Sequence, residues 1–406
     1  MGVVFKIIKK LLELFYGYPI YLVSFLIPRD PKKIVVGSHT PFNDNSKYFF
    51  ILSQAYLPEY EIIWITQSKE VEERIKNLGL SVYRKNRLKG LYHTLTAKFY
   101  IYSFHLIDIN FWTSGGSIKF NLWHGIPLKD IAFAIKSGPS AKLYNEKSIL
   151  SRIIRPQIFV RPDFMLTTSD EMSGYFAHAF RIDKKQCLKY GMPRCDILSW
   201  SKSQVKEFIH TYESDEMLKL VTNLTTYEKV FIYMPTWREN VDFLDEAGFD
   251  FVKLNQTMQD ENKLFIFKLH PFSKLKNIKL DEIDAFSNLM VLDGNMDVYP
   301  ILPFTDCLIS DYSSIYYDYL LCENKEIYLY PYDHSEYVLE SRDLAFDYNE
   351  SMPGLHIENF GHLLNMVKCG KNSFSKEQIK IREKYFKEEK GRSVNQLCQF
   401  LKGMSQ

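Results

Sequence analysis

Polar and titratable side chains come directly after apolar runs at four points of the chain. They are, in chain order, His124 with Gly125 after "KFNLW", Thr236 with Arg238 after "VFIYM", Lys268 and His270 at the end of "LFIFKLH", and Ser310, Asp311, Ser313 and Ser314 after "CLI". Open α/β sheets bind ligands beyond the carboxyl ends of their strands. These residues are therefore the first candidates for a functional site.

His124 could act as a general base. An imidazole near its ordinary pKa accepts a proton from an alcohol at neutral pH. Gly125 removes the neighbouring side chain, so that a ligand can approach the backbone closely, and Pro127 stiffens the turn. A hydrogen-bonded structural histidine is the alternative, and it is the more common role of an isolated histidine.

Three cationic side chains suit a diphosphate. Lys268 and His270 are two residues apart on a predicted strand, so their side chains would leave the same face. An ammonium and an imidazole that converge at a strand end can bind phosphate oxygens, and Arg238 would add bidentate contacts. The alternatives are a surface lysine, a structural histidine and an exposed salt-bridged arginine.

The stretch "LISDYSSIYYDYLL" predicts a strand followed by an amphipathic helix, with Ser313 or Ser314 as its N-cap. The free N–H groups and the partial positive charge of a helix N-terminus suit a phosphate or pyrophosphate. Plain helix capping is the alternative for a lone Ser-Ser pair. Asp311 would repel an anion at this place, so we expect it to hold a hydroxyl-bearing or cationic neighbour.

The elements that must position these residues form two alternating series. Short β-rich runs separated by helical stretches occupy residues 32–170, and a second series follows a polar helical stretch at 201–227. Such alternation predicts an α/β fold of two Rossmann-type domains with parallel sheets that face a central cleft. We expect an N-terminal segment at 1–30, a first α/β domain at 31–205, a second at 206–375 and helices at 376–406 that pack back across the domains.

The composition narrows the class of protein. A chain of 406 residues with 46% hydrophobic and 25% charged residues fits a globular protein of two domains. A net charge of +2 gives no overall field for nucleic acid. The six cysteines form no C-x-x-C pair, which favours free thiols in a reducing compartment over a zinc site. The sequence has no Walker loop, G-x-G-x-x-G, G-x-S-x-G or H-E-x-x-H.

The N-terminal segment joins Lys6, Lys9 and Lys10 to a mostly apolar run at 11–27. No small-x-small cleavage site follows, and Glu13 together with a Gly-Tyr-Pro break makes the run marginal as a membrane span. We interpret the segment as a cationic amphipathic element on the inner membrane face. A helix packed on the protein's own core is the alternative.

Taken together and in this order, the motifs resemble the CDP-glycerol glycerophosphotransferase family, the teichoic-acid-type primases and polymerases of bacteria. The matching stretches are "NSKY" (45–48), "LWHGIPLK" (122–129), "YGMPRCD" (190–196), "YMPTWRE" (233–239), "FKLHP" (267–271) and "LISDYSSIYYDY" (308–319). The correspondence runs from about residue 32 to the C-terminus. Ile126 stands where the family usually has Thr, which leaves His124 in place but removes a hydroxyl beside it.

The resemblance implies a GT-B-like fold and a transferase, with the acceptor bound by the domain at 31–205 and the CDP donor by the domain at 206–375. Such an enzyme would move glycerol phosphate, or another alditol phosphate, from a CDP-activated donor to an acceptor hydroxyl and release CMP, in the synthesis of a teichoic-acid-like or capsular polymer. The implied partners are CDP-glycerol or CDP-ribitol, a lipid-linked or polymer acceptor and the membrane surface, without nucleic acid. The implied location is peripheral, on the cytoplasmic face of the bacterial membrane.

The resemblance also suggests roles for the candidate residues. His124 would be the general base, and His270 with Lys268 would bind the pyrophosphate and stabilise the charge on CMP. The remaining donor-binding candidates are Arg238, Thr236, Asp311, Ser313, Ser314 and Gly125. We expect no bound cofactor and no protein metal ligand, since these cations could neutralise a diphosphate without Mg²⁺, whose participation the sequence leaves open.

Two rival interpretations remain at this stage. Polysialyltransferase-like GT-B enzymes also carry His-Pro and Ser-Ser motifs and use a CMP-activated sugar, and the stretch at 122–129 favours the glycerophosphotransferases over them. The other rival is a membrane-bound scaffold without activity that keeps a nucleotide-like cleft.

Overall fold

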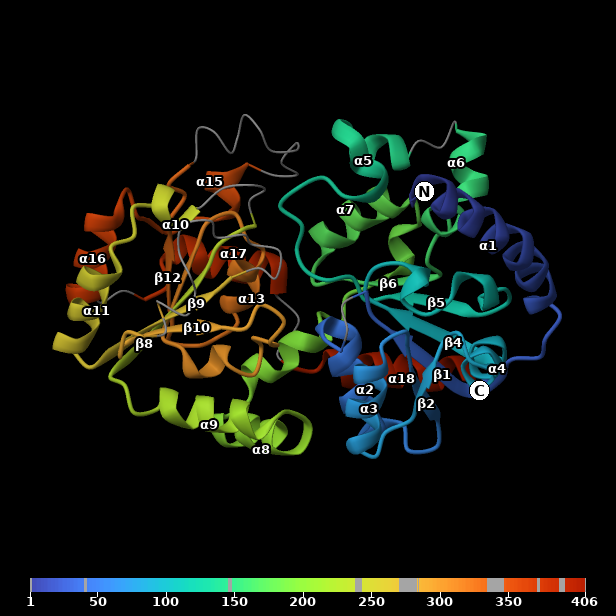
Figure 1. Ribbon diagram of the computed structural model, residues 1–406, viewed down its shortest axis with the longest axis horizontal. Helices are drawn as coiled ribbons and strands as arrows, with labels where there is room; N and C mark the ends of the chain where they lie inside the picture. The colour runs from blue at the N-terminus through green and yellow to red at the C-terminus, as the bar shows by residue number, and fades with distance from the viewer. Residues whose placement is uncertain are drawn as a thin grey trace. The chain divides into compact units, whose positions relative to one another are not determined.

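The computed structural model describes residues 2–39, 42–144, 148–237, 243–269, 283, 285–333, 347–370, 373–386 and 391–405. The chain divides into two compact units, each built on one sheet (Figure 1). The first unit comprises Met1–His124, Ile131–Asp196 and Glu388–Gln406, and the second comprises Gly125–Asp130 and Ile197–Lys387.

The sheet of the first unit has seven strands, all paired in parallel, in the order β3-β2-β1-β4-β5-β6-β7. The strands are β1 (Asp30–Gly37), β2 (Glu61–Thr66), β3 (Val82–Arg84), β4 (Ala97–Tyr102), β5 (Ile118–Asn121), β6 (Phe164–Leu166) and β7 (Cys187–Leu188). In β1 the consecutive residues Ile34, Val35 and Val36 are all fully buried. Because neighbouring side chains on a strand point to opposite faces, both faces of this sheet are covered.

The first unit also contains helices. In chain order they are α1 (Gly2–Ser24), α2 (Asp44–Tyr56), α3 (Lys69–Asn77), α4 (Leu88–Thr96), α5 (Gly138–Leu143), α6 (Ile149–Ile154), α7 (Asp170–Phe180) and the C-terminal α18 (Ser393–Ser405). Helix α18 packs against α2, and the Asp196 carboxylate accepts hydrogen bonds from the N–H groups of Ser393 and Val394, each at 3.0 Å. The carboxylate therefore caps the last helix of the chain and holds it in the first unit.

Helix α1 is continuous through Pro19, where the sequence suggested a break. The helix packs on the turn at Phe111–Thr113, and a Cβ on Gly17 would lie 2.4 Å from the Trp112 ring. Tyr21 stacks on Phe111 with their ring centroids 4.7 Å apart. This packing holds the helix together across the proline, and glycine is needed at 17 for the close approach to the indole.

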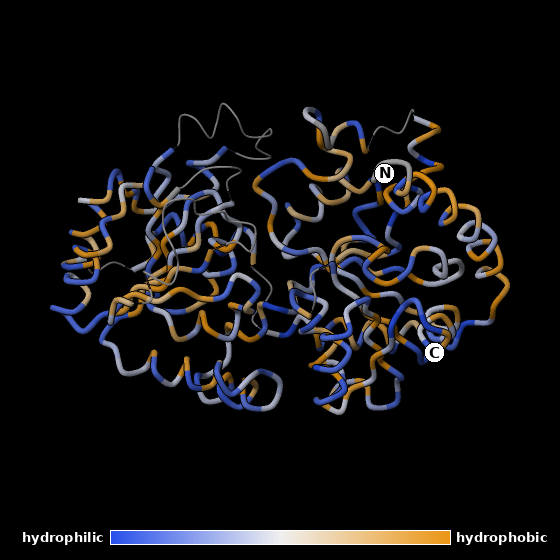
Figure 2. The backbone as a smooth tube through the Cα atoms, viewed as in Figure 1, coloured by the Kyte–Doolittle hydropathy of each residue, from blue (hydrophilic) through white to orange (hydrophobic). Residues whose placement is uncertain are grey.

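The second unit contains a six-stranded parallel sheet in the order β10-β9-β8-β11-β12-β13. Its strands are β8 (Lys229–Met234), β9 (Lys263–Lys268), β10 (Leu289–Leu292), β11 (Cys307–Ser310), β12 (Glu326–Leu329) and β13 (Leu355–His356). Its helices are α8 (Lys202–Tyr212), α9 (Asp215–Leu224), α10 (Phe243–Glu246), α11 (Phe251–Asp260), α13 (Ile315–Tyr319), α15 (Tyr348–Ser351), α16 (Phe360–Cys369) and α17 (Lys376–Phe386). Apolar residues concentrate in the strands of both units (Figure 2).

Helix α13 differs from the amphipathic helix that the sequence predicts. It has five residues and all of them are buried. Its polar groups have partners inside the protein: the Tyr316 hydroxyl donates to the carbonyl oxygen of Pro353 at 2.6 Å, and Asp318 accepts from the Tyr299 hydroxyl at 2.6 Å. The tyrosine-rich pattern thus reflects a helix that is covered on all sides, in which the Tyr316 hydroxyl and the Asp318 carboxylate bond to protein groups instead of water.

Each sheet has one place where the order of strands changes direction. It lies between β1 and β4 in the first unit and between β8 and β11 in the second. A crevice opens at such a point beyond the carboxyl ends of the strands, and ligands of open α/β sheets bind there. The two strand orders therefore define two edges at which functional side chains are expected.

Candidate active site

His124 lies at the carboxyl edge of the first sheet, three residues beyond the end of β5. Its Nδ1 is 3.3 Å from the carbonyl oxygen of Ser103, the residue that follows β4. Since a carbonyl oxygen can only accept, Nδ1 carries the proton in this contact and Nε2 keeps its lone pair. This is the tautomer in which Nε2 can accept a proton from a bound hydroxyl.

The protein environment lowers the pKa of His124. The largest cause is loss of hydration from the protein atoms packed around the ring, although the residue is exposed; Asp44 and the bond to Ser103 raise the pKa, and Arg194 and His39 lower it further. The sequence predicts an ordinary pKa for His124, whereas its surroundings in the structure lower the pKa, which favours the neutral ring. A histidine with a lowered pKa is neutral at pH 7, as a general base must be.

The backbone around His124 adopts conformations that few residues tolerate. Gly125 has φ 139°, which requires glycine, and Trp123 has φ 53°, in the left-handed region. That region costs a residue with a Cβ about 1–2 kcal/mol. Three hydrogen bonds offset this strain. The N–H of Trp123 donates to Asn121 Oδ1 at 2.9 Å, and Asn45 Nδ2 donates to the carbonyl oxygens of Trp123 at 2.8 Å and of Leu122 at 3.3 Å. Bonds of this kind contribute about 0.5–1.5 kcal/mol each, enough together to hold the turn.

In the second unit, Asp311 ties together the two strands at the change of direction. Its Oδ1 accepts hydrogen bonds from the N–H of Thr236 at 2.8 Å and from the Thr236 hydroxyl at 2.7 Å. Thr236 follows β8 and Asp311 follows β11. The expectation that this carboxylate holds a hydroxyl-bearing neighbour is confirmed, and the tie fixes the backbone at the sheet edge.

Lys268 ends β9 and is almost completely buried. Burial lowers the pKa of its ammonium to about 8, and Asp293 and Asp297 oppose the change. Its Nζ donates to the carbonyl oxygen of Gly294 at 2.6 Å. An ammonium with this pKa is still mostly charged at pH 7, and it has two further N–H groups with which it can bind an anion.

Ser313 and Ser314 are half-buried after β11. Ser314 occupies the N-cap position of α13, but its φ of −64° and ψ of −13° are already helical, and its hydroxyl makes no capping hydrogen bond within the described part of the chain. Helix capping is therefore not the role of the Ser314 hydroxyl in the described structure.

Two predicted site residues, Arg238 and His270, lie outside the described residues. The convergence of Lys268 with His270 and the phosphate contact of Arg238 therefore stay predictions. No group of three or more His, Cys, Asp or Glu side chains that could hold a metal ion occurs among residues that the structure describes.

Several residues near His124 were not predicted as functional, although they belong to matched motifs. Arg194, from "YGMPRCD", forms an ion pair with Asp44 in which Nη1 lies 2.8 Å from Oδ1, and both side chains are largely buried. Asn45 and Ser46 begin "NSKY" and are fully buried. The motif contains these residues, but their contacts follow only from the strand order, which sets β1 beside β4 and so brings Ser46 to Gly37 and Ser103.

Comparison with known proteins agrees with this architecture. A family model described as CDP-Glycerol:Poly(glycerophosphate) glycerophosphotransferase matches residues 20–403. A teichoic acid glycerol-phosphate transferase of Staphylococcus aureus is 24% identical over 411 residues, which cover 97% of this chain and 98% of that protein. A teichoic acid ribitol-phosphate primase of Bacillus spizizenii is 22% identical over 397 residues, which cover 95% of each chain.

A solved structure of the wall teichoic acid polymerase TagF superimposes with a TM-score of 0.74 at 18% identity, covering 98% of this chain and 97% of that chain. At this identity the likeness speaks for the fold. It confirms the predicted α/β, GT-B-like architecture with two parallel sheets.

Proposed function

Because the chain belongs to the CDP-glycerol:poly(glycerophosphate) glycerophosphotransferase family, we propose that it transfers an alditol phosphate from a CDP-activated donor to an acceptor hydroxyl and releases CMP. The donor is CDP-glycerol or CDP-ribitol, and the product is a teichoic-acid-like or capsular polymer. Relatives of both kinds, a glycerol-phosphate transferase and a ribitol-phosphate primase, match along almost the whole chain.

The observation that supports the proposal most strongly is the state of His124. The ring is hydrogen-bonded through Nδ1, its pKa is lowered, and its side chain is exposed at a sheet edge. In the proposed reaction Nε2 takes the proton of the acceptor hydroxyl. The hydroxyl oxygen then forms a bond to the phosphorus that carries the alditol, the bond from this phosphorus to the bridging oxygen breaks, and that oxygen leaves with CMP.

The second unit would bind the donor. Lys268 supplies positive charge for the diphosphate. The hydrogen bond between Thr236 and Asp311 fixes the backbone of the sheet edge at which the diphosphate would bind. Arg238, His270, Ser313, Ser314 and Gly125 complete the proposed donor contacts. Phosphoryl transfer depends mainly on positioning and on stabilisation of charge, and this set of groups supplies both. The proposal requires that His124 and the donor phosphates meet during the reaction.

A donor panel tests the proposed activity. CMP release is measured with CDP-glycerol, CDP-ribitol and CMP-sialic acid, each with a lipid-linked acceptor, and the product is analysed by mass spectrometry. We expect CMP and an acceptor enlarged by one alditol phosphate from a CDP-alditol, and no product from CMP-sialic acid. Transfer from CMP-sialic acid alone would replace the proposal with the sialyltransferase alternative, and absence of transfer from all three would contradict it.

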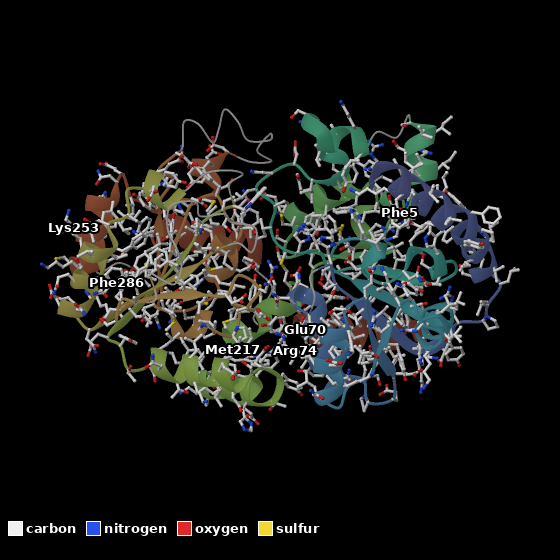
Figure 3. All side chains as sticks on the ribbon, viewed as in Figure 1. Phe5, Glu70, Arg74, Met217, Lys253 and Phe286 are labelled. Carbon is white, nitrogen blue, oxygen red and sulfur yellow. The ribbon has the colours of Figure 1, made fainter. Side chains whose placement is uncertain are left out.

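We also propose that the enzyme works at the cytoplasmic face of the bacterial membrane, with α1 on the membrane surface. The described helices include none long and apolar enough to cross a bilayer. One face of α1 packs on the first unit, and the other exposes large apolar side chains, among them Phe5 (68% exposed; Figure 3) and Phe15 (72%). Amphipathic helices of this kind bind with the apolar face in the headgroup boundary and lysines toward anionic lipid.

Helix α6 extends this apolar surface. The Tyr18 hydroxyl of α1 donates to the carbonyl oxygen of Ile153 in α6 at 2.8 Å, so the two helices are adjacent. We use the name N-terminal apolar face for the exposed apolar residues of the two helices: Phe5, Ile7, Ile8, Leu11, Leu12, Phe15, Leu22, Val23, Ile149, Leu150 and Ile153.

Vesicle flotation tests the membrane role. Phe5→Ser/Phe15→Ser should lose binding to phosphatidylglycerol vesicles, whereas the control Leu88→Ser/Val252→Ser, which removes two equally exposed apolar side chains elsewhere, should bind like the wild type. Equal loss in both double variants would show that the N-terminal apolar face has no special role.

A further inference from the structure

The first turn of α2 carries two residues that contact the surroundings of His124. Asn45 is fully buried, and its amide donates to the carbonyl oxygens of Leu122 and Trp123. Ser46 is also fully buried, and its N–H donates to the Ser103 hydroxyl at 3.1 Å, while the two hydroxyls lie 2.7 Å apart. Ser103 is the residue whose carbonyl oxygen contacts the His124 ring.

The Asn45 amide has only one orientation that satisfies its neighbours. Its Oδ1 accepts from the N–H of Arg194 at 3.1 Å, and its Nδ2 faces two carbonyl oxygens. A flipped amide would set oxygen against oxygen and nitrogen against an N–H. Arg194 is itself held by its ion pair with Asp44, and Ser46 Oγ donates to the Gly37 carbonyl oxygen at 2.7 Å. The α2 turn is thus anchored independently of His124.

We propose that Asn45 and Ser46 are positioning residues for His124: Asn45 holds the left-handed turn that sets the backbone of the histidine, and Ser46 holds Ser103 through its hydroxyl, so that the Ser103 carbonyl oxygen sets the tautomer. This inference rests on the proposed function, in which His124 is the base. Neither side chain touches a substrate in this scheme, so both act through the imidazole.

The physical consequence of losing Asn45 follows from the strain at Trp123. Without the two donated bonds, only the bond from the Trp123 N–H to Asn121 still stabilises the left-handed conformation, and Trp123 relaxes toward an ordinary φ. The peptide between Trp123 and His124 rotates, and Nδ1 loses its alignment with the Ser103 carbonyl oxygen. The imidazole then populates both tautomers, and only one of them presents a lone pair on Nε2. A misplacement of about 1 Å can reduce a rate by about 10²-fold.

Asn45→Asp is the sharpest test, because it keeps the shape and the acceptor for Arg194 but removes the N–H donors. Asn43→Ala is the matched control, since Asn43 caps the same helix by accepting from the N–H of Asp44 at 2.7 Å. The readouts are turnover, donor KM, and the ¹⁵N resonances of the His124 ring in ¹⁵N-histidine-labelled full-length protein, assigned by comparison with His124→Gln.

We expect the wild type and Asn43→Ala to show protonated Nδ1 and unprotonated Nε2 at His124. Asn45→Asp should show exchange between the two tautomers, with turnover reduced about 10²-fold and donor KM unchanged. Wild-type ring resonances in Asn45→Asp, or an equal loss of turnover in Asn43→Ala, would overturn the proposal.

Ser46→Ala keeps the test decisive if Asn45→Asp does not fold. It removes one hydroxyl that bonds to Ser103, and it should shift the tautomer balance with a smaller loss of turnover, up to about tenfold; unchanged ring resonances would count against the proposal. If the wild type transfers no alditol phosphate, the proposed function fails, but the ring resonances still decide whether Asn45 and Ser46 fix the histidine.

Discussion

The carboxyl edges of the two sheets are organised in opposite ways. In the first unit, hydrogen bonds with neutral groups hold His124 and its neighbour Trp123: Asn45 donates to the Trp123 carbonyl oxygen, Asn121 accepts from the Trp123 N–H, and the Ser103 carbonyl oxygen accepts from His124 Nδ1. The charged Asp44 and Arg194 beside them neutralise each other as an ion pair. In the second unit, the edge is organised by charged groups, namely the Asp311 carboxylate on Thr236 and the buried ammonium of Lys268. In both sheets the order of the strands reverses once, in the same manner, so the strand order alone does not assign the roles of the two sheets.

The difference fits the proposed division of the reaction between the two sheets. A base must be uncharged to accept a proton, and the first unit lowers the pKa of its histidine. A phosphate site must stay charged, and the second unit leaves Lys268 with a pKa of about 8 even though burial lowers it. The first edge therefore suits a hydroxyl and the second suits an anion.

The largest effect should come from removing the base. His124→Gln should reduce turnover about 10²–10⁴-fold, the usual contribution of general base catalysis, and leave donor affinity unchanged, because the proposed donor site belongs to the other unit. CMP release at saturating substrates and calorimetry with CDP-glycerol measure the two quantities. A parallel loss of donor affinity would break the division of roles between the units.

Lys268→Met should weaken donor binding by about 10–100-fold, since hydrogen bonds to charged groups contribute about 1.5–3 kcal/mol. Lys263→Met is the matched control: Lys263 lies at the opposite end of the same strand and donates to the carbonyl oxygens of Val367 and Lys368. Calorimetry should show a weakened donor only for Lys268→Met, and equal affinities in the two variants would remove Lys268 from the site.

Thr236→Val should weaken the donor edge more mildly. It deletes the hydroxyl bond to Asp311 and keeps the backbone bond, so we expect donor affinity to fall about tenfold or less, in line with one lost hydrogen bond. Thr257→Val, which deletes a hydroxyl bond to the Lys253 carbonyl oxygen within α11, should leave the affinity unchanged. Donor affinity equal to the wild type in both variants would mean that the tie is purely structural.

The smallest expected effects are in the pH dependence of kcat/KM and of donor affinity, which should differ between the two units. His124 must be neutral, and its pKa is lowered, so the acid limb of kcat/KM should lie below the ordinary histidine value of 6.5. Lys268 must be protonated, so donor affinity should fall as the pH rises through about 8. Lys268→Met should abolish the alkaline limb and keep the acid limb. An acid limb above 6.5 would contradict the assignment of His124.

Much of the fold can be predicted from the sequence, because strands in a sheet covered on both faces appear as continuous apolar runs. The two predicted series of β-rich runs correspond to the two sheets, but β7 and β13 were missed because each has only two residues, too few to show a period. Two helices depart from what their local sequence predicts. Helix α1 continues through Pro19 because it packs on Trp112. Helix α13 is fully buried instead of amphipathic because its polar groups, such as the Tyr316 hydroxyl, have partners inside the protein.

The site was predictable only in part. His124 stands out because it ends an apolar run beside a glycine, and Asp311 stands out because a carboxylate beside an anion site needs a partner. The Ser103 contact could not be predicted, since a backbone carbonyl oxygen leaves no trace in residue types. Asn45 acquires its role from the contact of α2 with the end of β5, which are 77 residues apart in the chain.

The Asp196 cap on α18 has a consequence for biosynthesis. The first unit uses residues from both ends of the chain, and about 190 residues of the second unit are translated between Asp196 and its helix. At about 5–20 residues per second, the ribosome needs roughly 10–40 s to supply α18 after Asp196 emerges. During that interval the surface of α2 that α18 later covers is open to chaperones, and the second unit can finish folding before the first.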